Sequence, residues 1–185
     1  MKRDKLRSLV AVGAVVSAGS LLGSSSALAV PREGEAAPNA RMEDADGRIA
    51  ELKAFAGKPI LIVYEDRDSA KQNHALKSEL AELARGERYQ ARIALAAVAD
   101  VSAWDFWPAK GMVRDAIRDE SRKQGTTIYC DWTGAFRSAY QLRRGVSNVV
   151  LVGRDGRVLF AAEGVLDAAS RKRLFALLKA QVEGI

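Results

Sequence analysis

The sequence predicts an α/β protein with a central mixed β-sheet flanked by helices and an N-terminal β-hairpin extension. Apolar runs of strand length alternate with amphipathic segments of helical length through the middle of the chain, which is typical of parallel strands joined by helices. Two Asp-Gly pairs, Asp46-Gly47 and Asp155-Gly156, each predict a hairpin because both residue types tolerate positive φ. The last segment carries an apolar stripe at helical spacing from Leu174 to Val182.

The first strand of the predicted core follows an irregular lead-in at residues 30–38, the first hairpin and the breaker Gly57-Lys58-Pro59. Residues 60–64 (Ile-Leu-Ile-Val-Tyr) form a continuous run without a charge. Such a run predicts a strand that is buried on both faces, as in a parallel sheet.

A helix is predicted from the acidic turn at residues 65–69 to about Ala84. Ser69 and Gln72 have the spacing of a capping box, so either Asp68 or Ser69 could cap its first turn. Three leucines mark its apolar face: Leu76, Leu80 and Leu83.

Residues 89–98 predict a second buried strand and residues 126–130 a short third one. The helix between them begins near Pro108 and ends at Gly125, in keeping with the preference for proline at helix starts and glycine at helix ends. Four side chains are expected on its inner face: Met112, Val113, Ala116 and Ile117.

The loop before this helix is dense in aromatic residues, with Trp104, Phe106 and Trp107 close together. These side chains could form a patch for a partner, because exposed aromatic residues anchor interfaces. The alternative is that they fold back over the core, which is the commoner fate of large apolar side chains.

The last part of the chain predicts a turn at Asp131–Gly134 and a brief helix through Tyr140. Strands at residues 149–152 and 158–161 then flank Asp155-Gly156 and lead to the closing helix.

Residues 1–29 have the pattern of a cleavable signal peptide. Four basic residues open it: Lys2, Arg3, Lys5 and Arg7. An uncharged run from Leu9 to Leu22 follows, and Ala27-Leu28-Ala29 has the small-x-small form of a cleavage site. The run is shorter than the ~20 residues of a membrane span, although a retained anchor is the alternative. We expect a periplasmic or otherwise extracytoplasmic protein, cleaved near Ala29, with one domain at residues 30–185 and no membrane span after cleavage.

The charge balance argues against nucleic-acid binding. The whole chain carries 29 basic and 23 acidic residues, a net charge of +6. Without residues 1–29 there are 25 basic and 22 acidic residues, a net charge of +3, which is ordinary for a solvated surface. An exported protein also meets little nucleic acid, so we expect a protein partner or a small ligand instead.

Four segments resemble the thioredoxin-like superfamily, in particular its redoxin and TlpA-type members. They are Gly34–Pro38, Asp46-Gly47, Gly57–Pro59 and Val152–Arg157, in the order and spacing of that superfamily over nearly all of residues 33–182. The resemblance implies a thioredoxin-like fold.

A closer resemblance is to the YtfJ family, small periplasmic thioredoxin-fold proteins without a firm activity. It rests on Ser69-Ala70-Lys71 with Asn73, Tyr89-Gln90, Asp131–Gly134, Gln141-Leu142, Ser147–Leu151 and Gly164–Leu166. The resemblance implies a compartment and a fold, but little chemistry.

The usual redox groups of this superfamily are missing. Redox-active members carry Cys-x-x-Cys, and peroxiredoxins one cysteine, at the start of the helix that follows the first core strand, where the helix lowers the thiol pKa. The corresponding stretch, Glu65 to Asn73, has no cysteine, and Ser147 stands where the superfamily has a cis-proline.

Cys130, the only cysteine, leaves two readings open. It could be a peroxide-sensing thiol or a thiol that pairs between chains, since it ends a parallel strand, where ligand sites gather in α/β folds. It could instead be a half-buried strand residue that acts as a small apolar side chain, since no histidine or helix start is placed to activate it.

Six residues are candidates for a binding site: Asp68, Ser69, Lys71, Asn73, Ser147 and Asn148. Ser69, Lys71 and Asn73 match the family motif and lie at the start of the predicted helix, where backbone N–H groups attract anions. They could bind a small anion or the main chain of a partner. The structural alternative is that Ser69 caps, Asn73 satisfies buried backbone groups and Lys71 is solvated.

Glu65, Asp66 and Asp68, with His74 beyond them, could in principle hold a divalent cation. Their spacing matches no known loop and His74 points away from the apolar face, so capping and surface charge explain them and no metal site is predicted. His74 is the only histidine, and no Gly-x-Ser-x-Gly or Walker loop is present, so we expect neither a catalytic triad nor a cofactor.

The sequence therefore favours an extracytoplasmic thioredoxin-fold protein that lacks the conventional redox site and works by binding. The alternative is an enzyme, a single-cysteine thiol oxidoreductase or peroxidase that uses Cys130.

Overall fold

The structure, a computed structural model, describes residues 30–86, 89 and 91–184, so the predicted signal peptide lies outside the described residues. Its strands are β1 (Arg41–Asp44), β2 (Ile49–Glu51), β3 (Ile60–Glu65), β4 (Ala94–Asp100), β5 (Ile128–Asp131), β6 (Asn148–Val152) and β7 (Val158–Glu163). Its helices are α1 (His74–Ala84), α3 (Ala109–Gln124), α4 (Ala135–Ala139) and α5 (Ala168–Glu183). Three 3-10 turns connect them: η1 (Leu52–Phe55), η2 (Ser69–Lys71) and η3 (Ser102–Trp104).

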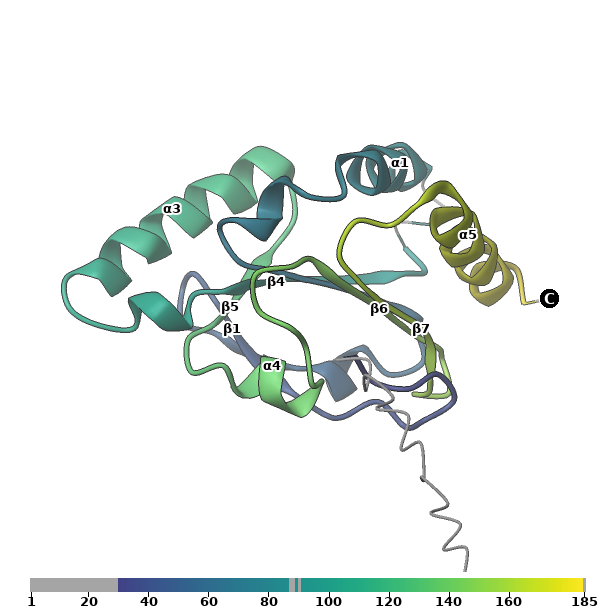
Figure 1. Ribbon diagram of the computed structural model, residues 1–185, viewed down its shortest axis with the longest axis horizontal. Coiled ribbons are helices and arrows are strands. Elements are labelled where there is room, and N and C mark those ends of the chain that lie inside the picture. The colour runs from purple at the N-terminus through teal and green to yellow at the C-terminus, as the bar shows by residue number, and fades with distance from the viewer. Residues whose placement is uncertain (1–29, 87–88, 90, 185) are drawn as a thin grey trace, which may run out of the picture.

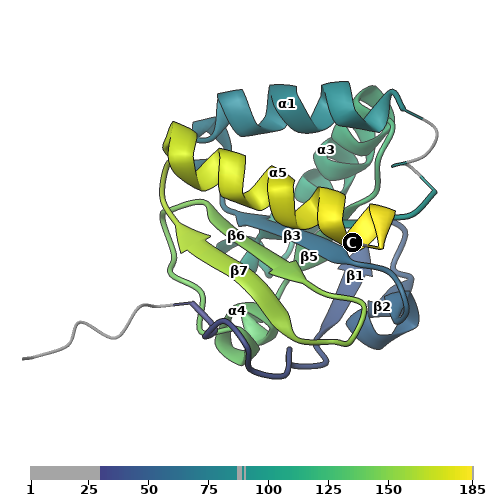
Figure 2. The same ribbon diagram turned by 90° about the vertical axis from the view of Figure 1, so that its right-hand side faces the viewer.

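All seven strands form one mixed sheet in the order β2-β1-β5-β4-β3-β6-β7. The central strands β3, β4 and β5 are parallel, and the remaining pairs are antiparallel. Helices α1, α3 and α5 lie on one face and α4 on the other (Figures 1 and 2). The predicted order of elements, with a hairpin at each end, is confirmed.

The uncharged run of β3 is buried on both sides because its side chains alternate between two cores. Leu61 faces α1 and α5 and packs with Leu76 and Leu174. Ile62 and Tyr64 belong to the core under α4. There the rings of Tyr64, Phe136 and Tyr140 stack in series, with centroid distances of 5.8 and 5.0 Å.

The helix predicted from Ser69 begins later, at His74. Asn73 separates η2 from α1 because its φ of 57° is left-handed, a conformation that asparagine tolerates better than most residues. The predicted cap was wrong, since neither Asp68 nor Ser69 caps a helix through its side chain. The Ser69 hydroxyl is held by Asp66 instead.

The strand predicted at residues 89–98 spans Ala94–Asp100. Tyr89 is helical; its N–H donates to the Gly86 carbonyl, and its own carbonyl accepts from the Ile93 N–H. These local bonds keep Tyr89 out of the sheet, and Gln90 lies outside the described residues.

Helix α3 ends at Gly125 with a φ of 62°, as predicted, but only half of its predicted inner face is correct. Val113 and Ile117 pack against the sheet, whereas Met112 and Ala116 are exposed. The helix packs along β5 and has no fully buried residue, so its contact stripe is narrower than periodicity suggests.

The aromatic loop does not fold back over the core. The side chains of Trp104, Phe106 and Trp107 are exposed at the start of α3, which overturns that interpretation.

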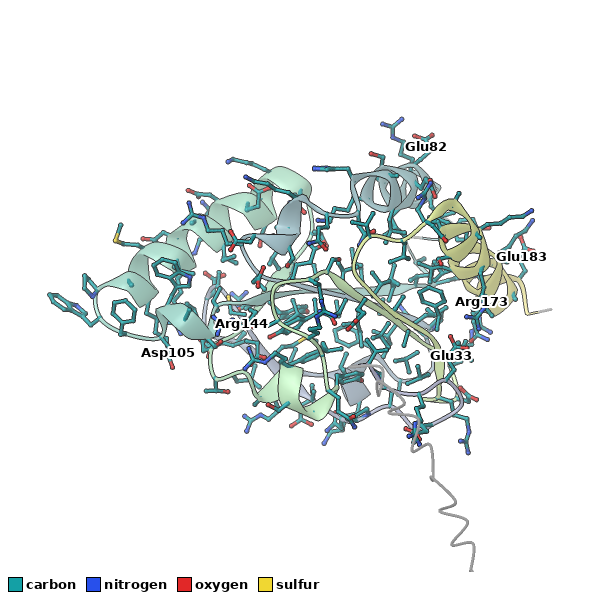
Figure 3. All side chains as sticks on the ribbon, viewed as in Figure 1. Glu33, Glu82, Asp105, Arg144, Arg173 and Glu183 are labelled. Carbon is teal, nitrogen blue, oxygen red and sulfur yellow. The ribbon has the colours of Figure 1, made fainter. Side chains whose placement is uncertain are left out.

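The lead-in runs beside β7, where Ala36 forms an antiparallel bridge with Arg157. Glu33 pairs with Arg173 of α5 and fastens the lead-in to the domain (Figure 3). No helix within residues 30–86, 89 and 91–184 is long and apolar enough to cross a membrane.

Candidate functional site

The loops at the carboxyl end of β3 carry the stretch from Glu65 to Asn73, which is where redox members of the superfamily would hold their cysteines. Asp66 organises its first turn. One carboxylate oxygen accepts from the Ser69 backbone N–H at 2.8 Å and from the Ser69 hydroxyl at 2.7 Å. The other accepts from the Gly145 N–H at 2.8 Å. Burial opposes ionisation of Asp66, but the hydrogen bonds from Ser69, Gly145 and Asp68 hold its pKa below the usual value.

Ser147, immediately before β6, is fully buried and joins two loops. Its backbone N–H donates to the Gln72 side-chain oxygen at 3.0 Å, and its hydroxyl donates to Glu65 at 2.7 Å. The second Glu65 oxygen accepts from Lys77 of α1, also at 2.7 Å. The loop after β3 and the loop before β6 are therefore hydrogen-bonded to each other.

Asn73 connects the start of α1 to the loop after β7. Its side-chain nitrogen donates to the Gly164 carbonyl at 2.8 Å, and its oxygen accepts from the Leu166 N–H at 2.7 Å. Asn73 is buried, so both backbone groups would lose their partner if the amide were removed.

Asn148 holds the loop before β6 together through its side-chain amide. Its side-chain oxygen accepts from the Arg143 N–H, and its nitrogen donates to the carbonyls of Arg143 and Val146. The amide is fully buried and holds the turn that carries Gly145 and Ser147.

The six residues predicted to bind a ligand divide into two groups. Four are buried, with polar atoms committed to hydrogen bonds inside the protein: Ser69, Asn73, Ser147 and Asn148. Asp68 and Lys71 are exposed. The buried four shape this end of the sheet, and direct contact with a ligand is left to Lys71, Asp68 and their neighbours.

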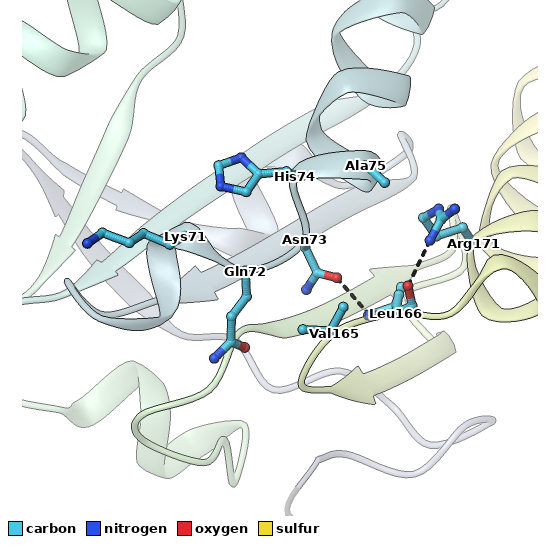
Figure 4. Close-up of a pocket in the computed structure, with 8 residues that line it drawn as sticks. All are labelled: Lys71, Gln72, Asn73, His74, Ala75, Val165, Leu166 and Arg171. Atoms are coloured by element: carbon cyan, nitrogen blue, oxygen red, sulfur yellow. Dashed lines mark hydrogen bonds between the residues drawn. The ribbon is translucent and has the colours of Figure 1, made fainter.

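A shallow pocket of about 380 Å³ opens beside this network. It is lined by Lys71, Gln72, Asn73, His74, Ala75, Val165, Leu166 and Arg171 (Figure 4). Val165 is exposed, and the Arg171 guanidinium is fixed by the Leu166 carbonyl and by Glu79. The pocket thus combines apolar side chains with the basic side chains of Lys71 and Arg171.

A second polar cluster was not predicted from the sequence. Asp100 ends β4 and Asp131 ends β5, and the parallel register places them side by side. Both are buried. Asp100 accepts from the Arg137 guanidinium at 2.7 Å, and Asp131 accepts from the Tyr64 hydroxyl at 3.0 Å and from the Arg137 backbone N–H.

The surroundings of this cluster favour a charged Asp100 and a neutral Tyr64. Burial acts against ionisation of Asp100, but hydrogen bonds from Ser102 and the charge of Arg137 hold its pKa below the usual value. Burial, followed by the nearby charges of Asp131 and Asp100, raises the pKa of Tyr64 far above its usual value, so the phenol stays a donor. The two aspartates at the ends of neighbouring strands could have indicated this cluster from the sequence. Nothing in the sequence indicates that Arg137 joins it.

Gly134 explains part of the Asp131–Gly134 motif. Its φ is 73°, and a Cβ at this position would lie 2.7 Å from the Arg137 guanidinium. The glycine therefore leaves room for Arg137 to turn back toward Asp100.

Cys130 is buried with Val101 and Trp132. Burial, followed by the charge of Glu43, raises the pKa of its thiol to about 12. The structure thus favours the reading of Cys130 as a small apolar residue. Within the described part of the chain, no group of three or more His, Cys, Asp and Glu side chains could hold a metal ion.

The sequence matches, over residues 40–181, the YtfJ_HI0045 family, described as a bacterial protein of unknown function. No curated protein matches the chain in sequence.

Several solved structures are similar in fold. A candidate thiol:disulfide interchange protein DsbE from Chlorobium tepidum is 18% identical, with a TM-score of 0.60 over 82% of this chain and 98% of that one. An uncharacterized conserved protein from Geobacillus kaustophilus is 18% identical, with a TM-score of 0.63 over 83% of each chain. The bacterioferritin comigratory protein of Xanthomonas campestris is 18% identical, with a TM-score of 0.56 over 77% of this chain and 92% of that one. These likenesses confirm the thioredoxin-like fold.

Proposed function

We propose, from the premise that this chain belongs to the YtfJ_HI0045 family of bacterial proteins of unknown function, that it works outside the cytoplasm as a binding protein without thiol–disulfide chemistry of its own. One observation carries the proposal. The two loops that hold Cys-x-x-Cys and the cis-proline in redox members of the superfamily contain no thiol and are hydrogen-bonded to each other through Glu65, Asp66 and Gln72.

The competing function, a thiol oxidoreductase or peroxidase that uses Cys130, has no comparable support. A reactive thiol needs both access and a lowered pKa. Cys130 is buried and its pKa is raised to about 12.

Export is the second part of the proposal. Its support is the basic start, uncharged run and Ala27-Leu28-Ala29 of the sequence. Val30, the first residue after the expected cut, is packed in the core under α4.

We expect the protein recovered from the periplasm of cells that express the full-length chain to begin at Val30. The intact mass checks this expectation. A mass that includes residues 1–29, or a protein that stays in the cytoplasm, contradicts export.

The binding surface that fits best is the pocket at the start of α1. Lys71 gives its rim a positive charge, Arg171 is already paired with Glu79, and Val165 adds exposed apolar surface. Such a surface suits an acidic group joined to an apolar one, on a protein partner or a small ligand.

A photoreactive amino acid at Val165 is expected to crosslink, in living cells, to one protein or one small ligand. The same residue at Ile49 is the matched control, because Ile49 is also exposed but lies on β2 at the far edge of the sheet. Mass spectrometry of the products is the measurement, and Lys71→Glu should weaken the Val165 product several-fold if the bound group is acidic. Equal products from both positions, or none from Val165, would contradict a binding role for this pocket.

A further inference from the structure

Four apolar side chains, which we call the aromatic tip, project from the loop before α3 and from its first turn. The exposed fractions are 91% for Trp107, 72% for Met112, 56% for Phe106 and 39% for Trp104. Asp105, within the same loop, is labelled in Figure 3 near the start of α3, where side chains reach outward from the molecule. Large side chains are seldom this exposed in a group, and such groups mark interaction surfaces.

The aromatic tip is held in a fixed place. Arg114 of α3 pairs with Glu43 of β1, and Arg118 donates to Asp46 and to the Ala45 carbonyl. These contacts fasten α3 to the N-terminal hairpin although the helix has no fully buried residue. The helix that carries the aromatic tip is therefore already placed before binding, which reduces the entropy lost on association.

We propose that the aromatic tip is the interface of a symmetric dimer, in which the tips of two copies of this chain pack against each other. The three aromatic side chains expose about 440 Å². With Met112, two copies together would bury about 1,100 Å², close to the ~1,200 Å² of the smaller specific interfaces before any rim is added.

The charges at the aromatic tip favour a second copy over a lipid surface. The tip has one acidic and one basic side chain, Asp105 and Lys110, which form an ion pair in each copy. Under two-fold symmetry, Asp105 of one copy can face Lys110 of the other, so the rim is complementary to itself. A membrane-binding surface has an excess of basic side chains around its apolar centre, whereas here the single basic side chain, Lys110, is balanced by Asp105.

Sedimentation velocity of the protein purified after export tests the proposal, over protein concentrations from about 1 µM to about 1 mM, where interfaces of this size dissociate. The wild-type protein should change from monomer to dimer across this range. The double variant Phe106→Ser/Trp107→Ser should stay monomeric throughout. Both side chains are exposed, so circular dichroism should show an unchanged fold.

Ile49→Ser is the control, because it removes an exposed apolar side chain of the β2 edge, away from the tip, and should dimerise as the wild type does. A wild-type monomer at every concentration, or a dimer that survives the double variant, would overturn the proposal. The proposal would also be overturned if the wild-type protein stayed monomeric and pelleted with phosphatidylcholine vesicles while the double variant did not. That result would assign the tip to membranes. None of these outcomes depends on the pocket at Val165.

Discussion

In the folded protein, Cys130 should react with a small thiol reagent near neutral pH about 1,000-fold more slowly than the same thiol in the unfolded chain. The thiolate is the reactive species, and burial raises the pKa of Cys130 to about 12 from the free-thiol value of about 8.5, which lowers the thiolate fraction by at least about three powers of ten. Burial of the sulfur beside Val101 and Trp132 restricts access as well. The measurement is the rate of modification in buffer and in denaturant, across pH 5 to 9.

The pH profile separates this expectation from a redox function. The logarithm of the rate should rise steadily to pH 9 without a plateau, and Cys130→Ser should abolish the signal. A plateau at a pKa below about 8.5, the value of a free thiol, would instead restore the thiol oxidoreductase alternative.

Arg137→Met is expected to lower the free energy of unfolding at pH 7 by about 2–3 kcal/mol. The substitution leaves the buried Asp100 carboxylate without its cation, and losing one partner of a buried pair is costly. We expect a loss below the roughly 3–5 kcal/mol of a fully buried pair because 26% of the Arg137 side chain is exposed. Urea denaturation measures the change.

The double variant Asp100→Asn/Arg137→Met is the control, since it removes both charges together and should recover most of the loss. The pH dependence provides a second check. The folded pKa of Asp100 is lowered, so its ionisation stabilises the protein above the unfolded value of about 3.9, and this contribution is lost as the pH falls through the folded pKa. The difference between Arg137→Met and wild type should therefore shrink in acid. A difference that is the same at pH 7 and pH 3 would contradict the ion-pair explanation.

Local signals explain why most of the fold could be predicted. Asp46-Gly47 and Asp155-Gly156 favour turns through their own backbone preferences, and the run at residues 60–64 has to be buried wherever it lies. The start of α1 could not be predicted because the side chain that fixes it, Asn73, bonds to backbone groups far along the chain. Asn73 bonds to Gly164 and Leu166, about 90 positions away.

The candidate site was predictable in part. The stretch from Glu65 to Asn73 and Ser147 were identified by resemblance, but the hydrogen bonds that join them are tertiary. The cluster of Asp100, Asp131 and Arg137 was missed because strand pairing and α4 bring together residues that have no spacing in common.

By itself, the sequence determined that the protein has an α/β architecture and only one thiol, because residue identity, turn chemistry and apolar patterning are properties of the chain. Only the tertiary structure decided which side chains are reachable. Cys130 is buried, the side chains of Ser69 and Asn73 form internal hydrogen bonds, and Trp107 is exposed to solvent. The physical reason is that exposure and pKa depend on what packs around a residue, and distant segments, brought together by the sheet and its helices, supply those neighbours.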